Sequence, residues 1–161
     1  MRIVGGTCRG RSLKTPKGRE IRPTSDKVRE ALFDILGDLI LERDFLDLFA
    51  GTGAVGIEAM SRGAATTVFV ERDPSALALL RQNIHGCGLA DRAEVIQGDV
   101  MRMPARLNRP GRDYSCIFVD PPYRFEDHDS LLRKLEEEGL VKEDTIVVLE
   151  HAAKKELNQP E

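Results

Sequence analysis

The stretch DLFAGTGAVG, residues 47–56, indicates which fold the chain adopts. Its glycines, Gly51, Gly53 and Gly56, have the spacing G-x-G-x-x-G between an apolar strand and a helix. Such a turn lets the backbone come close to a ligand at the N-terminus of a helix. Glu71 ends the next apolar run, where a carboxylate can accept hydrogen bonds from ribose hydroxyls. The pattern therefore predicts a site for a ribose-containing ligand.

On both sides of this stretch, predicted strands alternate with predicted helices. This alternation is typical of βαβ units, so we expect an α/β, Rossmann-like fold with a mostly parallel central sheet and helices on both faces. Strands are expected around residues 45–50, 66–71, 93–97, 114–119 and 145–150, helices around 25–38, 54–63, 74–87 and 128–138, and a looser segment over 100–112.

The length and composition are typical of one globular domain. The chain has 161 residues, of which 41% are hydrophobic, and no run of about 18 apolar residues, so a cytoplasmic protein without membrane insertion is expected. Cys8, Cys87 and Cys116 are scattered, which argues against a disulfide framework and against a zinc site. The three histidines are not at metal-ligand spacing and are predicted to be surface or capping residues: His85, His128 and His151.

Charge is distributed unevenly along the chain. Residues 1–29 carry nine basic and two acidic side chains, a balance of +7, whereas the rest carries 15 basic and 25 acidic, a balance of −10. The glycine pairs and alternating small, apolar and basic residues of RIVGGTCRGRSL suit a short hairpin that displays arginines. We therefore predict a basic N-terminal hairpin that contacts nucleic-acid phosphates.

Two further acids bear on which ribose-containing ligand is bound. Asp47 lies within the strand before the glycine turn, where an acid is unfavourable beside a pyrophosphate but favourable beside a cationic sulfonium. Asp99 ends the third strand in QGD and could accept a hydrogen bond from an adenine amine, although an Asp in such a turn is also a common helix cap. These acids favour S-adenosylmethionine over a dinucleotide.

The stretch DPPY, residues 120–123, directly follows the apolar run YSCIFV. Pro121 and Pro122 have no N–H and restrict the residue before each of them, which leaves the Asp120 carboxylate and the Pro121 carbonyl as acceptors. An exocyclic base amine has two N–H donors that could bind both, while Tyr123 stacks on the base. Alignment of this kind requires neither a metal nor a Ser/His pair.

These motifs together resemble a known enzyme family. DLFAGTGAVGIEAMSRGA, the acid of VERD, QGD and DPPY look like the class I S-adenosylmethionine-dependent amino-methyltransferases. RIVGG, GRSL and RPTSDKVREALF narrow the resemblance, over residues 2–151, to the bacterial 16S ribosomal RNA guanine-N2 methyltransferases of the small subunit. Members of that family continue into a final strand pair, whereas this sequence stops at KKELNQPE, so either the sequence is shortened or the sheet lacks its last two strands.

The resemblance implies methyl transfer to the N2 amine of one guanine in 16S rRNA, within an assembling or assembled subunit. It implies a monomeric enzyme with an RNA-contacting extension over residues 1–24 and a catalytic domain over 25–161. The predicted site residues fall into three groups: catalytic, Asp120, Pro121, Pro122 and Tyr123; cofactor-binding, Asp47, Phe49, Gly51, Gly53, Glu71, Arg72, Asp99 and Val100; and RNA-binding, Arg2, Arg9, Arg11, Lys14, Arg19, Arg22 and Arg124.

Three alternatives remain open. A DNA adenine-N6 methyltransferase would share the DPPY chemistry but normally needs a separate region that recognises and flips its target base. An NAD-dependent oxidoreductase is disfavoured by DPPY and Asp47 and by the lack of a substrate domain. A non-catalytic RNA-binding domain would keep the basic hairpin without the reaction.

Overall fold

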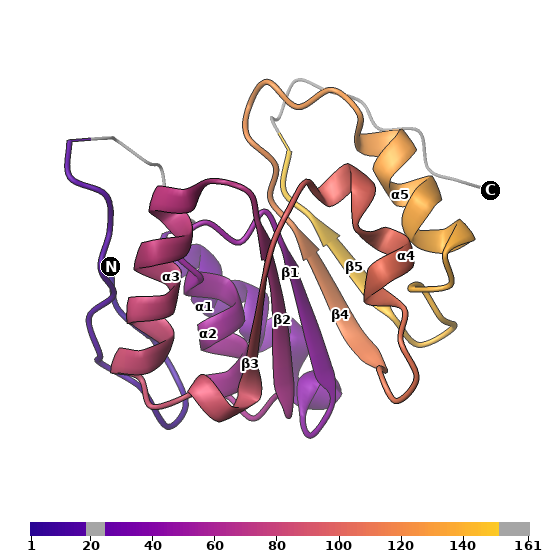
Figure 1. The fold of residues 1–161 in the computed structure, drawn as a ribbon. Helices are drawn as coiled ribbons and strands as arrows, with labels where there is room; N and C mark the ends of the chain where they lie inside the picture. The colour runs from indigo at the N-terminus through magenta and orange to yellow at the C-terminus, as the bar shows by residue number, and fades with distance from the viewer. Residues whose placement is uncertain (19–24, 152–161) are drawn as a thin grey trace.

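Five parallel strands form one sheet, as the alternation of strands and helices predicts (Figure 1). Their order in the sheet is β3-β2-β1-β4-β5. The computed structural model describes residues 1–18 and 25–151, and no strand follows β5 within these ranges. The strands are β1 (Asp44–Leu48), β2 (Thr66–Glu71), β3 (Ala93–Gln97), β4 (Tyr114–Val119) and β5 (Ile146–Leu149).

The helices also follow the predicted pattern, with two differences. The first predicted helix is an α-helix only to Leu36, because Gly37, with φ of 49°, ends it and a 3-10 turn follows. The segment over 100–112, expected to be loose, contains two short helical elements. The elements are α1 (Asp26–Leu36), η1 (Gly37–Ile40), α2 (Ala54–Ser61), α3 (Pro74–Gly86), η2 (Ala90–Arg92), η3 (Val100–Arg102), α4 (Pro104–Leu107) and α5 (His128–Glu137).

Cap residues mark the starts of two helices. The Ser25 side chain accepts a hydrogen bond from Val28 N at 3.3 Å at the N-terminus of α1. Asp73 does the same for Ser75 N at 3.1 Å, and Pro74 occupies the first position of α3, where its missing N–H costs nothing.

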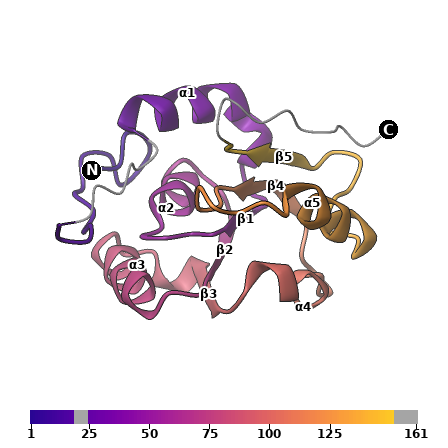
Figure 2. The ribbon, with the colours of Figure 1, turned by 90° about the horizontal axis from the view of Figure 1, so that it is seen from above.

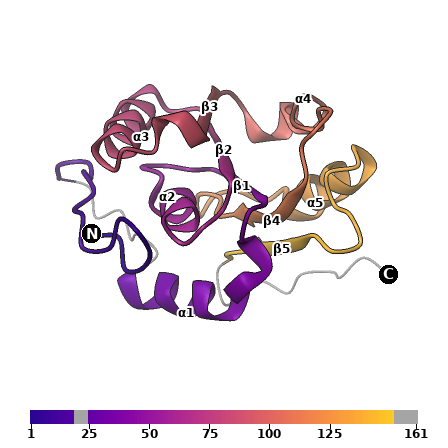
Figure 3. The ribbon, with the colours of Figure 1, turned by 90° about the horizontal axis from the view of Figure 1, so that it is seen from below.

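Helices cover both faces of the sheet (Figures 2 and 3). On one face, Phe45, Phe69 and Phe118 pack under α1, α2 and α3. Side chains that alternate with these phenylalanines along the strands, such as Leu46 and Val68, point to the other face and pack under α4 and α5. Every residue of β4 is buried, as expected for a central strand of a parallel sheet.

The strand order reverses direction between β1 and β4. The helices that follow β1 and β2 lie on one face, and those that follow β3 and β4 lie on the other. β1 pairs with β2 through Asp47 and Phe69, and with β4 through Asp47 and Phe118. Open α/β sheets bind ligands at the carboxyl ends of the strands beside such a reversal. The glycine turn and DPPY both start at this point.

The N-terminal residues form the expected hairpin. Arg2 and Ser12 make an antiparallel bridge, with Ile3 N donating to Arg11 O at 2.9 Å. Ile3 is fully buried in the same core as α2 and α3, so the hairpin is part of the packed structure. At its turn, Gly6 has φ of 75°, and a Cβ there would lie 1.8 Å from Ser61 O at the end of α2.

A buried carboxylate holds the hairpin to α2. Both oxygens of Glu58, which is fully buried, accept backbone hydrogen bonds, from Val4 N at 2.9 Å and Gly5 N at 2.8 Å. Arg62 Nε donates to Glu58 Oε1 at 2.9 Å, and the fully buried Arg29 lies 3.8 Å from Glu58 Oε2. Arg29 also donates to the carbonyl of Arg2 and pairs with Asp26 at 2.9 Å.

Replacing Glu58 with Ala is expected to lower the free energy of unfolding by roughly 3–5 kcal/mol, because the buried Arg29 loses one of its two carboxylate neighbours and the N–H groups of Val4 and Gly5 lose their acceptor. Urea unfolding followed by circular dichroism measures the change. The matched control is Glu137→Gln, at an exposed position of α5, which should change the free energy of unfolding by less than about 0.5 kcal/mol. Similar small effects for both variants would mean that this network does not stabilise the fold.

Candidate active site

The glycine turn after β1 has the backbone geometry that its sequence predicts. Gly51 and Gly53 have φ of 56° and 84°, values that side chains disfavour, and Phe49 adopts φ of 60° as a non-glycine residue. A Cβ at Gly53 would lie 2.2 Å from Leu80 of α3, whereas a Cβ at Gly51 would meet nothing within 4 Å. Gly53 therefore permits close packing, and Gly51 leaves open space beside the turn.

Asp47 is buried directly beneath this turn. Its side chain is 2% exposed, and Oδ2 accepts a hydrogen bond from Gly56 N, in the first turn of α2, at 2.9 Å. Burial raises the pKa of Asp47 well above its ordinary value, the Gly56 N–H opposes this, and the charges of Asp120 and Glu71 raise it further. The charges of two other predicted site acids therefore act on Asp47.

Glu71, at the end of β2, ties the glycine turn to the neighbouring strand. Its Oε2 accepts from Gly51 N at 2.8 Å, and its Oε1 accepts from Arg72 N and Asp73 N, each at 2.8 Å. The Arg72 side chain is exposed. Glu71 therefore lies where a ligand on the turn could exchange hydrogen bonds with its carboxylate.

Asp99 acts as a helix cap in the structure. Its Oδ1 accepts from Met101 N at 2.9 Å at the start of η3, the capping alternative that the sequence left open. Val100, which follows it, buries its side chain in the core beneath α4 and α5.

DPPY follows β4 and leads into a turn closed by a hydrogen bond from Phe125 N to Pro122 O at 2.8 Å. Asp120 is partly buried; burial, followed by the charge of Glu150, raises its pKa to about 7. Tyr123 is 79% exposed, so its ring is available to a partner. The loop rises above the carboxyl edge of the sheet (Figure 1).

Three aromatic rings packed side by side support this loop, and no sequence motif predicts this packing. Phe125 contacts Phe49 and His128 edge-on, with ring centroids 5.1 Å apart in each pair. Phe49, which the sequence predicts only as a cofactor-binding residue, thus also packs against the loop that begins with DPPY. His128 is 6% exposed, so its prediction as a surface or capping residue is wrong: the start of α5 packs it against Phe125.

The basic side chains of the N-terminal segment are partly engaged with the body. Arg11 donates to Gly86 O at 2.5 Å, Lys14 donates to Gln82 Oε1 at 2.8 Å, and Arg2 lies 3.8 Å from Asp26. Arg9 is exposed, as is Arg124 beside Tyr123. Two of the predicted RNA-binding residues, Arg19 and Arg22, lie outside the described residues.

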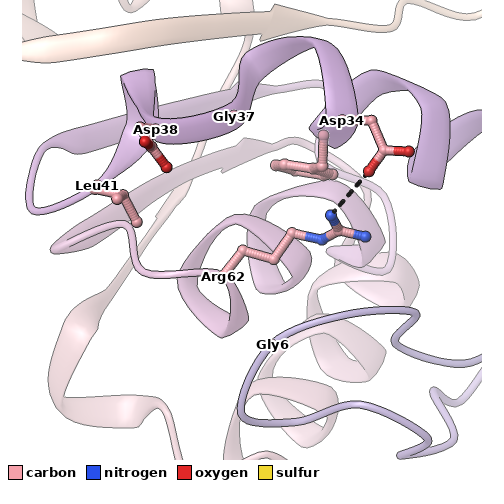
Figure 4. Close-up of a pocket in the computed structure, with 7 residues that line it drawn as sticks. Gly6, Asp34, Gly37, Asp38, Leu41 and Arg62 are labelled. Atoms are coloured by element: carbon pink, nitrogen blue, oxygen red, sulfur yellow. Dashed lines mark ion pairs between the residues drawn. The ribbon is translucent and has the colours of Figure 1, made fainter.

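A shallow depression lies away from these acids, between α1, η1 and the end of α2 (Figure 4). Arg62 reaches into it and pairs with Asp34 at 3.7 Å, while its guanidinium lies 5.3 Å from the centroid of the Phe33 ring. It holds none of the predicted catalytic or cofactor-binding residues. Its lining residues are Gly6, Phe33, Asp34, Gly37, Asp38, Leu41 and Arg62.

Within residues 1–18 and 25–151, no three His, Cys, Asp or Glu side chains are grouped so that they could hold a metal ion. The same residues include no helix with the length and apolar character needed to cross a membrane.

The chain is similar in sequence and in fold to known proteins. Residues 1–161 match the family model described as Conserved hypothetical protein 95. Ribosomal RNA small subunit methyltransferase D of Escherichia coli (strain K12) is 36% identical over 93% of this chain and 74% of that protein. The protein of the same name from Haemophilus influenzae is 33% identical over 100% and 83%. The solved structure of a hypothetical protein from Thermus thermophilus is 38% identical, with a TM-score of 0.85 over 98% of this chain and 89% of that chain.

Replacing Asp120 with Asn is expected to stabilise the protein above pH 7. Because the folded-state pKa of Asp120, about 7, exceeds the ordinary value of about 4, the folded state binds more protons between these values. The wild-type free energy of unfolding therefore falls as pH rises through this range, and Asn, which cannot ionise, avoids the loss. We expect a difference of roughly 1–3 kcal/mol at pH 8 and almost none at pH 3.

Urea unfolding at pH 3, 5 and 8 measures this difference, with the exposed Asp91→Asn as control. A difference between Asp120→Asn and wild type that stays constant across this range would contradict a raised pKa of Asp120.

Proposed function

The chain belongs to the family described as Conserved hypothetical protein 95, which includes ribosomal RNA small subunit methyltransferase D, and from this premise we propose that it methylates the exocyclic N2 amine of a specific guanine in 16S rRNA. In this proposal the methyl donor is S-adenosylmethionine. The substrate is 16S rRNA within an assembling or assembled small subunit, and a monomeric enzyme acts on it in the cytoplasm.

One observation carries the proposal: Asp120 of DPPY follows the strand that pairs with β1, and its charge acts on Asp47 beneath the glycine turn. A group that can orient an amine thus lies beside a turn that can hold a nucleoside. Burial and the charges of Asp120 and Glu71 disfavour the ionised form of Asp47, and acids with raised pKa values that lie together are typical of functional sites.

The residues of the turn fit S-adenosylmethionine. Gly51 leaves open space beside the turn, and Glu71 presents carboxylate oxygens that now bind backbone N–H groups and could accept ribose hydroxyls instead. The raised pKa of Asp47 reflects burial without a neighbouring cation, and a positively charged ligand would favour its ionised form. When bound, S-adenosylmethionine supplies a methyl group on a positively charged sulfur.

On the acceptor side, the Asp120 carboxylate and the Pro121 carbonyl would each accept one N–H of the guanine amine. Holding both N–H groups fixes the direction of the nitrogen lone pair, so the contribution of the protein is alignment. With a pKa of about 7, Asp120 can also take up a proton from the amine near neutral pH. The exposed ring of Tyr123 would stack on the base, and Phe125, packed between Phe49 and His128, holds the loop in place.

Residues 1–24 would form an RNA-contacting extension of the catalytic domain over 25–161. The charge balance supports this, because the body after residue 29 carries −10 and would repel phosphates without the basic segment.

Methyl transfer from labelled S-adenosylmethionine tests the function directly. Naked 16S rRNA, assembly intermediates and mature small subunits, all lacking the modification, are offered in parallel with unmethylated DNA, and the modified nucleotide is mapped. We expect label on N2 of one guanine. Label on adenine N6 of DNA, or calorimetric binding of NAD without any response to S-adenosylhomocysteine, would refute the proposal.

Asp120→Ala and Glu71→Ala are expected to separate turnover from cofactor binding. Asp120→Ala should keep S-adenosylhomocysteine affinity within a few-fold and lower kcat by at least about 100-fold, because it removes a group that orients the acceptor. Glu71→Ala should weaken S-adenosylhomocysteine binding by at least about tenfold, because it removes the acceptor and releases Gly51 N. Calorimetry and single-turnover assays measure the two effects, with exposed Glu143→Ala as control. Equal losses of binding alone in both variants would make Asp120 a pocket residue.

Removing three basic side chains of the N-terminal segment, in the variant Arg9→Ala/Arg11→Ala/Lys14→Ala, is expected to weaken RNA binding and its dependence on salt. For single-stranded RNA, each lost phosphate contact reduces the slope of log affinity against log salt by about 0.7, so three contacts change it by about two. Filter binding at several salt concentrations measures the slope, with exposed Arg133→Ala as control. Unchanged slopes would place the RNA surface elsewhere, starting with the loop that carries Arg124.

A further inference from the structure

Asn83 of α3 joins the N-terminal segment to the glycine turn. It is 4% exposed, and its amide makes three hydrogen bonds to main-chain atoms of two distant segments. Its Oδ1 accepts from Lys14 N at 2.7 Å, and its Nδ2 donates to Lys14 O at 3.0 Å and to Thr52 O at 2.9 Å. One buried side chain therefore contacts both the segment proposed to bind RNA and the turn proposed to bind the cofactor.

The position of Asn83 is not explained by the helix that contains it. Asn is a weak helix former, and burying an amide is costly unless its donors and acceptor are paired. Neighbouring buried positions of α3 carry apolar side chains, Leu77, Leu80 and Ile84, which pack into the core. Here both donors and one acceptor are used, and none of the three bonds lies within α3.

On the turn side, Thr52 lies between the two glycines with positive φ. Gly51 N is held by Glu71, and Gly53 packs against Leu80, one turn of α3 before Asn83. Asn83 of α3 therefore holds the Thr52 carbonyl, while Glu71 at the end of β2 holds the preceding amide, Gly51 N. A change at Asn83 would reach the segment that the cofactor must contact.

On the RNA side, Asn83 holds the backbone of Lys14 through two bonds that resemble a strand pairing. Lys14 and Arg11 also place their side chains on α3, at Gln82 and Gly86. Figure 1 shows the indigo N-terminal segment running beside α3. Of the hydrogen bonds described between side chains of α3 and this segment, those of Asn83 alone continue to the glycine turn.

We propose that Asn83 is a positioning residue that couples RNA binding on the N-terminal segment to cofactor affinity at the glycine turn; this rests on the function proposed above. RNA that fixes the Lys14 backbone reduces the motion of Asn83 and, through Thr52, that of the turn. The cofactor then loses less conformational entropy on binding, so each ligand increases affinity for the other. Because such coupling is reciprocal, it can be measured from either ligand.

The test is calorimetry of S-adenosylhomocysteine with and without saturating unmethylated 16S rRNA transcript. For wild type we expect RNA to lower the Kd of S-adenosylhomocysteine about fivefold or more. Asn83→Ala should bring this ratio to about one. Asn83→Asp keeps an acceptor for Lys14 N but has no donor for Thr52 O or Lys14 O, so it should also lose the coupling while it keeps one of the two hydrogen bonds to Lys14.

Ser61→Ala is the matched control for loosening of the hairpin. Ser61 Oγ accepts from Cys8 N at 2.9 Å and donates to Gly5 O at 2.6 Å, so its loss removes two attachments of the hairpin without affecting the glycine turn. We expect Ser61→Ala to weaken RNA binding but to keep the wild-type ratio of S-adenosylhomocysteine Kd values. Thermal unfolding of each variant confirms that it is folded, and Asn83→Asp serves if Asn83→Ala does not fold.

Each outcome has a defined meaning. Loss of the ratio in Asn83→Asp with retention in Ser61→Ala supports the proposal. Retention in both Asn83 variants, or equal loss in Ser61→Ala, overturns it. A wild-type protein that binds S-adenosylhomocysteine and RNA independently overturns the coupling but leaves the proposed function standing, whereas a wild-type protein that does not bind S-adenosylhomocysteine overturns both.

Discussion

Helix α2 lies so close to β1 and β2 that residue 56 has no room for a side chain. A Cβ at Gly56 would lie 2.3 Å from the Phe69 ring and 2.9 Å from Asp47 Oδ2. This proximity lets Gly56 N bind Asp47, and Gly56 O accept from the Thr67 hydroxyl at 3.2 Å. With the helix fixed in this way, its first residues shape the glycine turn and its later residues, Glu58 and Ser61, hold the hairpin. One helix thus positions both the proposed cofactor site and the proposed RNA-binding segment.

The carboxyl edge of the sheet gathers acidic side chains in surroundings that disfavour their ionised forms. Burial raises the pKa values of Asp47 and Asp120, and neighbouring carboxylates add to this in each case. Such an arrangement lowers stability in the absence of a cation. A ligand with a positive charge would bind the folded state alone and recover part of that stability. This charge pattern is the one expected if the positively charged cofactor proposed above binds at this edge.

Much of the fold could be predicted because the strands are short apolar runs separated by glycine and capping signals. The positions of Gly51, Gly53 and DPPY were likewise visible as motifs. Glu58 and Asn83 were not, because their partners are main-chain atoms of segments far along the chain, and no local pattern marks a polar helix residue that will be buried. His128 was missed for the same reason: its burial depends on Phe125, which becomes its neighbour only through the turn after Pro122.

The strand order also determines the sequence in which the site can be completed during synthesis. β1, β2 and β3 are neighbours in space and consecutive in the chain, so the nascent polypeptide can pair them, with α2 and α3, before β4 exists. Insertion of β4 beside β1 closes a much longer stretch of chain, which makes it the slower pairing. Asp120 directly follows β4 in the chain, so it takes its place in the site only when β4 pairs with β1. A partly synthesised chain therefore has the glycine turn and its carboxylates well before it gains the residue that would orient the acceptor amine.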